Sequence, residues 1–138
     1  SNRDEHLVGI YHIWYILVFM WNIVLDPIKD WLDTLDKDSA AQIQAALELL
    51  RDQGPNLKRP IVGKIEGSSI IRSLKELRPG SSGRSEIRIL FVFDPKRQAI
   101  MLVGGDKQRK WNKWYPKAIR QAEQRYVDWL EGQYGKEE

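Results

Sequence analysis

The chain has 138 residues, no cysteine, and 22 Lys/Arg against 19 Asp/Glu, which gives a formal net charge of +3. Its length fits one domain with a core of its own. Without cysteine, a disulfide framework and a thiolate metal site are both excluded, and the composition suits a reducing compartment such as the cytoplasm.

The modest net charge hides a strong asymmetry along the chain. Residues 1–57 carry four Lys/Arg against nine Asp/Glu, and residues 121–138 carry two against five. The middle block, residues 58–120, carries sixteen Lys/Arg against five Asp/Glu. Such a concentration is expected of a surface that binds a polyanion, although a solvated basic surface has the same composition.

Residues 7–25 form the most apolar part of the chain. A transmembrane helix needs roughly 20 predominantly apolar residues, and polar or small residues interrupt this window. We therefore divide the segment at Met20, with residues 1–19 as an apolar extension from a non-native start and residues 20–138 as the domain. A membrane anchor over residues 7–25, or an element that packs or self-associates, is the alternative.

A short strand at residues 21–25 and two amphipathic helices are predicted next. The first helix starts at Asp26-Pro27, an acid followed by proline at the first helical position. The second runs from Asp38 or Ser39 to Gly54-Pro55, a usual order for a helix stop. The pair is interpreted as an α-hairpin laid on a sheet. Helix caps and a solvated face account for its carboxylates, so no metal site is predicted.

From Ile70 onward the pattern is strand, loop, strand, turn and strand, and a last helix starts at Tyr115-Pro116. Residues 61–65 are compatible with a further short strand. These elements predict an α+β fold with an N-terminal strand, an α-hairpin, an antiparallel sheet of three to four strands and a C-terminal helix. We expect the helices to cover one face of the sheet, and the open face and following loop to handle RNA.

Strand alternation singles out Arg88. In the run Ile87 to Phe93 the odd-numbered positions share one face, and the even-numbered positions, Arg88 among them, share the other. A charged side chain in an apolar sheet is costly unless it is paired or faces a cleft. Two interpretations stay open: a buried ion pair with Glu76 or Glu86, or a guanidinium whose fork binds phosphate.

Further cations flank this strand. Lys75 and Arg78 are three apart, so a regular strand places them on opposite faces unless Pro79 ends the strand and lets Arg78 turn. Arg84 lies in a Gly/Ser loop that could close over a backbone phosphate. The segment 107–115 interleaves cations with aromatic rings, as single-stranded nucleic acid requires for phosphates and bases. Its members are Lys107, Arg109, Lys110, Trp111, Lys113, Trp114 and Tyr115. Alternatively, Trp114 or Tyr115 belongs to the core.

Three motifs in order, residues 74–79 (Leu-Lys-Glu-Leu-Arg-Pro), 88–94 (Arg-Ile-Leu-Phe-Val-Phe-Asp) and 104–107 (Gly-Gly-Asp-Lys), carry a family resemblance. Together with the element order, they resemble the RelE/ParE superfamily of bacterial toxins, and within it the phage-derived, HigB-like branch. The resemblance implies the toxin of a type II toxin–antitoxin system. Such a toxin is a ribosome-dependent mRNA endonuclease held inactive by a cognate antitoxin, here expected to be a helix-turn-helix protein.

The resemblance also implies roles for individual residues. Arg78 matches the basic residue that ends the second main strand, and Arg88 matches the arginine that contacts the scissile phosphate. Lys107 or Arg109 matches the cation after the last strand. Tyr115, less closely Trp111, stands where the family often has an aromatic residue.

The remaining chemistry is constrained by what the basic block lacks. The two histidines, His6 and His12, lie in the extension, and no pair of acids in the block suits two metals. RNA cleavage would then be metal-free and cofactor-free attack by the ribose 2′-hydroxyl, with cations stabilising the phosphorane. Lys75 and Lys107 are candidates for proton transfer, which a lysine pKa lowered by neighbouring cations would favour.

The candidate residues fall into two groups. The catalytic candidates are Lys75, Arg78, Arg88, Lys107 and Tyr115. The RNA-binding candidates are Arg84, Arg109, Lys110, Trp111, Lys113 and Trp114. Two alternative functions remain: a non-catalytic module of this fold that binds nucleic acid or protein, and a gyrase-directed toxin of the same fold.

Overall fold

The computed structural model describes residues 9–10, 13–14, 19–80, 85–108 and 111–134, without the side chains of residues 111 and 112. Within these residues, five strands form one sheet in the order β1-β5-β4-β3-β2. The strands are β1 (Asn22–Val24), β2 (Val62–Lys64), β3 (Lys75–Leu77), β4 (Ile87–Asp94) and β5 (Gln98–Asp106). The predicted strands at residues 21–25 and 61–65 are therefore present.

The sheet is mixed. Strands β2 to β5 pair antiparallel, whereas β1 runs parallel to β5, with Asn22 opposite Gln98. The predicted α+β class and element order are confirmed. The four antiparallel strands β2 to β5 fall within the three to four expected, and the N-terminal strand β1 joins them as a parallel edge strand beside β5.

The helices largely follow the prediction. The first arm of the predicted hairpin is a 3-10 turn, η1 (Asp26–Ile28), that continues into a single helical turn, α2 (Lys29–Leu32). Helix α3 (Lys37–Gln53) is capped by the Asp36 carboxylate, which accepts from the Ser39 backbone N–H. Gly54, at a positive φ of 52°, ends α3 and begins the turn η2 (Gly54–Asn56). Helix α4 (Trp111–Leu130) closes the fold; it begins before the predicted start at Tyr115-Pro116, so that Pro116 lies inside the helix.

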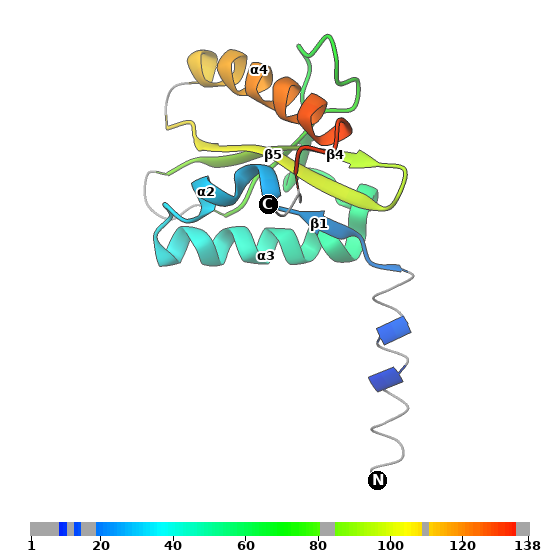
Figure 1. Ribbon diagram of the computed structural model, residues 1–138. Coiled ribbons are helices and arrows are strands. Elements are labelled where there is room, and N and C mark those ends of the chain that lie inside the picture. The colour runs from blue at the N-terminus through cyan, green and yellow to red at the C-terminus, as the bar shows by residue number, and fades with distance from the viewer. Residues whose placement is uncertain (1–8, 11–12, 15–18, 81–84, 109–110, 135–138) are drawn as a thin grey trace.

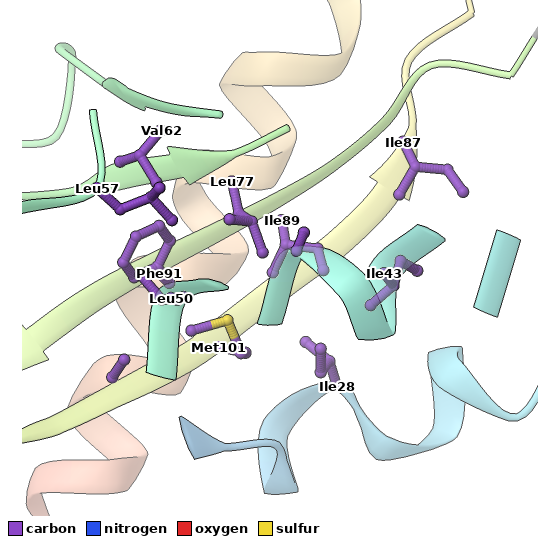
Figure 2. Close-up of a cluster of buried hydrophobic side chains, with 12 residues drawn as sticks. Ile28, Ile43, Leu50, Leu57, Val62, Leu77, Ile87, Ile89, Phe91 and Met101 are labelled. Carbon is purple, nitrogen blue, oxygen red and sulfur yellow. The ribbon is translucent and has the colours of Figure 1, made fainter. Parts of the chain in front are cut away.

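One face of the sheet packs against α3 and η1. Ile87, Ile89 and Phe91 of β4 lie there with Ile43 and Leu50 of α3, and Figure 2 shows this cluster. The alternation predicted for β4 is confirmed, since Leu90 and Val92 belong to a different cluster, on the other face.

That second cluster joins the sheet to α4. Ala118 and Ala122 of α4 pack on Leu90, Val92 and Leu102. Figure 1 shows α4 on one side of the sheet and α3 on the other. The expectation of an open sheet face was therefore wrong. Both faces of an apolar strand need cover, and α4 supplies the second.

Among the described residues, no helix is long and apolar enough to cross a membrane. Of the apolar extension, Ile10, Ile13, Trp14 and Phe19 are described and exposed. Most of residues 7–18 lie outside the described residues, so the division of the chain at Met20 stays a prediction.

Candidate functional site

The site is built around the carboxylate of Glu76. Glu76 is the middle residue of β3, opposite Leu90 of β4, and only 1% of it is exposed. The Arg78 Nε donates to Glu76 Oε1 at 2.9 Å, and the Arg88 Nε lies 3.7 Å from the same oxygen. The Tyr115 hydroxyl donates to the other carboxylate oxygen. One buried acid thus holds two guanidinium groups and a phenol at one end of the sheet.

Arg78 reaches Glu76 because it lies directly after the end of β3 and its side chain passes over Gly63. Its backbone N–H donates to the Ile61 carbonyl at 2.7 Å. Its guanidinium lies over Gly63, where a Cβ atom would come within 2.5 Å of the Arg78 terminal nitrogen. The absence of a side chain at Gly63 therefore lets Arg78 lie across the β2–β3 pair.

Arg88 occupies the position that the alternation of β4 predicted. Its side chain is 16% exposed, its terminal nitrogen donates to the Ile87 carbonyl at 2.8 Å, and its buried Nε makes no hydrogen bond within the described residues. Of the two interpretations, the buried ion pair is present, and its partner is Glu76. The pair is long, so the guanidinium keeps donor capacity for another anion.

Lys107 joins the site because of an irregularity in β5. The register shifts between Leu90 and Phe91, which face Val103 and Met101, so the intervening Leu102 is an extra residue. Regular alternation from Met101 would turn Lys107 toward the α3 face. The extra residue turns it to the face of Arg88 instead.

Lys107 is almost fully buried there. Its ammonium lies 5.5 Å from the centre of the Tyr115 ring and 3.9 Å from a Glu86 carboxylate oxygen. Burial and then the nearby Arg88 charge lower the pKa of Lys107, against the opposing effect of Glu76 and Glu86. The expected lowering of a lysine pKa in this site is therefore present, and burial rather than neighbouring cations is its first cause.

Tyr115 comes from the first turns of α4 and is half-buried. Burial raises the pKa of its phenol, and the hydrogen bond to Glu76 and the charge of Glu76 raise it further. The hydroxyl therefore stays protonated across the neutral range and acts as a donor to Glu76.

Other candidates lie elsewhere. Lys75 is opposite Phe91 and so belongs to the α3 face, away from Arg88. Lys113 is exposed, and Trp114 packs on the core over Gly105, edge-on to Tyr115. The core alternative for one of the two aromatics therefore fits Trp114. Arg84, Arg109, Lys110 and the side chain of Trp111 lie outside the described residues, so the roles given to them stay predictions.

The central role of Glu76 was missed from the sequence, which offered it as one of two ion-pair partners for Arg88. A signal was present, because Glu76 alternates with Leu74 on a buried face and so places a carboxylate among apolar residues. Its register against Leu90 and Arg88 could not be read from the sequence. Among the described residues, no group of three His, Asp or Glu side chains is placed to hold a metal ion.

Known proteins resemble this chain over most of its length. The family described as Phage derived protein Gp49-like (DUF891) matches residues 30–127. A protein of Mycobacterium tuberculosis (strain ATCC 25618 / H37Rv), provisionally named toxin HigB2, is 44% identical over 110 residues, which cover 80% of this chain and 54% of that protein. A second protein of the same strain, provisionally named toxin HigB3, is 43% identical over 113 residues, covering 82% of this chain and 96% of that protein. The chain thus spans about half the length of the first relative and nearly all of the second.

Proposed function

Since this chain belongs to the Gp49-like family of phage-derived proteins and is homologous to two provisionally named HigB toxins, we propose that it is a toxin that cuts mRNA on the ribosome. The observation that carries the proposal is the meeting of Arg78, Arg88 and Tyr115 on Glu76, with Lys107 beside them. Four of the five residues predicted to be catalytic are thus neighbours.

The charges of the site suit an RNA phosphate. Arg78 and Arg88, with side chains 31% and 16% exposed, are its accessible cations. Their ion pairs with Glu76 hold both guanidinium groups in fixed positions before substrate arrives. Preorganised donors of this kind stabilise the charge that develops on a pentacoordinate phosphorus.

In the proposed reaction, the ribose 2′-hydroxyl attacks the adjacent phosphorus, and the bond to the 5′-oxygen of the next nucleotide breaks. The products are a 2′,3′-cyclic phosphate and a free 5′-hydroxyl. Tyr115 takes the proton of the 2′-hydroxyl as its own proton passes along its hydrogen bond to Glu76. The leaving oxygen takes its proton from solvent, while Lys107, buried beside the Tyr115 ring, adds positive charge next to the site.

Acid–base power in such a site is limited, because a phenol with a raised pKa is reluctant to exchange its proton. Alignment of the RNA must then contribute much of the rate, and we assign that contribution to the ribosome. This assignment places the protein in the cytoplasm. A toxin of this kind also needs a cognate antitoxin, which we propose to be a helix-turn-helix protein.

Induced expression of the wild-type chain and the Arg88→Ala variant tests the proposal. We expect the wild type to stop growth and to leave cuts in translated mRNAs. Loss of one preorganised donor should lower cleavage by about 100-fold to 1,000-fold. Mapping of mRNA 5′ ends after induction measures the cleavage by each protein. The Glu76→Gln variant should lose cleavage as well, because it releases both arginines.

Lys29→Ala, an exposed cation on α2, is the matched control and should cut like the wild type. Because Arg88 is partly buried, Arg88→Lys and a thermal melt of each variant separate lost chemistry from lost folding. Intact mRNA with continued growth contradicts the proposal. RNA binding without cuts would instead indicate a binding module, and DNA damage a gyrase-directed toxin.

A further inference from the structure

A basic hollow lies on the edge of the sheet, outside the cluster around Glu76. It has a volume of about 380 Å³ and is called the edge hollow here; its lining residues are Leu57, Lys58, Arg59, Val62, Gly63, Lys64 and Lys75. Strand β2, which supplies part of its wall, is an edge strand of the sheet. Four of the lining residues are cations, and none of the described residues that line the hollow carries a carboxylate.

The pairing of β2 with β3 places two of these cations next to each other. Lys64 and Lys75 are direct cross-strand partners and so share one face of the sheet. Like charges directly opposite one another destabilise a sheet, and an anion between them would relieve the repulsion. A single lysine such as Lys64 is explained by its place on an edge strand, where a charge hinders pairing with another chain. This explanation does not account for Lys58, Arg59 and Lys75, which lie outside β2.

The edge hollow is adjacent to the candidate active site through one residue. Gly63 lines the hollow, and the Arg78 guanidinium lies over Gly63 from the side of Glu76. Lys75 and Glu76 are successive residues of β3, so they point to opposite faces. A basic path therefore leads from Arg88 and Arg78 around the β2 edge to Lys64 and Lys75.

We propose that the edge hollow binds the phosphate backbone of single-stranded RNA, as the continuation of the strand held at Arg78 and Arg88. The inference deepens the proposed function and rests on it. Cations around an apolar floor of Leu57 and Val62 suit a sugar–phosphate chain, for which contacts to phosphate carry no base preference. An acidic segment of a protein partner is the competing occupant.

The test compares two double variants of the full chain that each remove two lysines. Lys58→Gln/Lys64→Gln alters the edge hollow, and Lys29→Gln/Lys37→Gln removes the same charge from exposed positions on α2 and α3. The probe is a 2′-O-methyl RNA of about 12 nucleotides, a length within the range of single-strand sites. It keeps every phosphate and lacks the attacking hydroxyl.

Binding is measured by fluorescence anisotropy over a series of salt concentrations. For single strands, each lost phosphate contact lowers the slope of log K against log salt by about 0.7, so the hollow variant should lose about 1.4 and the control nothing. With a probe of about 4 nucleotides, too short to leave the Arg88 site, the hollow variant should bind like the wild type.

Equal slopes for the two double variants would overturn the inference. A hollow variant that keeps the wild-type slope with RNA and instead loses binding to an acidic partner protein would overturn it as well. The proposed function fails separately, through intact mRNA after induction of the wild type. If the slope falls only for the hollow variant and mRNA stays intact after induction, the edge hollow is an RNA-binding surface and the proposed nuclease activity is refuted.

Discussion

Tyr115 and Glu76 share the hydrogen bond on which the proton chemistry of the site depends. Burial beside a carboxylate disfavours the phenolate, so the folded chain keeps the Tyr115 proton to a higher pH than the unfolded chain does. Lys107 titrates in the opposite sense, because burial disfavours its charged form and lowers its pKa. The two residues therefore affect the pH dependence of stability in opposite directions.

The Tyr115→Phe variant tests the phenol. The ordinary tyrosine pKa is 10.0. Above that pH the unfolded chain loses the Tyr115 proton and the folded chain retains it, so the free energy of unfolding falls as pH rises. Tyr115→Phe should remove this fall. The measurement is urea unfolding from pH 8 to pH 11, with the difference between the two proteins plotted against pH.

The opposite contribution of Lys107, which raises stability as pH approaches 10.5, is present in both proteins and cancels in that difference. The raised pKa of Tyr134 cancels in the same way. A wild-type chain that loses no more stability than Tyr115→Phe above pH 10 would contradict the raised phenol pKa.

At the scale of elements, the end of β5 sets where the site lies. Gly104 and Gly105 face opposite sides of the sheet, and each accepts a tryptophan ring against its backbone. A Cβ atom on Gly104 would lie 2.2 Å from Trp31, and one on Gly105 would lie 2.5 Å from Trp114. The two glycines therefore let α2 and the first turns of α4 approach the sheet closely.

This arrangement gives a matched pair of variants. Gly104→Ala and Gly105→Ala should each lower the free energy of unfolding by about 1–3 kcal/mol, because each forces a ring to move. Gly105→Ala displaces Trp114 beside Tyr115 and should also reduce mRNA cleavage. Gly104→Ala moves Trp31 on the far face and should not. Urea unfolding and mRNA end mapping provide the two measurements, and equal cleavage by both variants would contradict the proposed dependence on α4.

At the scale of the molecule, two hydrophobic clusters of the described residues share the same pair of central strands. Phe91 belongs to the cluster under α3, and Leu102 to the cluster under α4. Disruption of the sheet on one face would also expose the hydrophobic cluster on the other face. The domain should therefore unfold in one cooperative transition.

Phe91→Ala and Leu102→Ala test that cooperativity. Both side chains are fully buried, so truncation should cost about 3–5 kcal/mol for Phe91 and about 2–5 kcal/mol for Leu102. Each variant should lower the urea midpoint without changing the slope m. Separate transitions by tryptophan fluorescence and by circular dichroism would show instead that the two faces unfold independently.

Much of this protein could be predicted from its residues alone. The HigB-like resemblance, carried by three short motifs, is confirmed at the level of the family. The order of elements and the facing of β4 are also confirmed, because both follow from local patterns: helix caps, turn residues and a period of two. Arg88 could be singled out for the same reason.

Contacts between distant segments were decided only by the tertiary structure. The extra residue Leu102 in β5 turned Lys107 toward Arg88, where regular alternation would have turned it away. The register of β3 on β4 chose Glu76 over Glu86 as the partner of Arg88, and α4 covered the face expected to be open. A local pattern specifies which way a side chain points along its own strand. Which neighbour it meets depends on pairing register and helix packing, and these are set by the whole core at once.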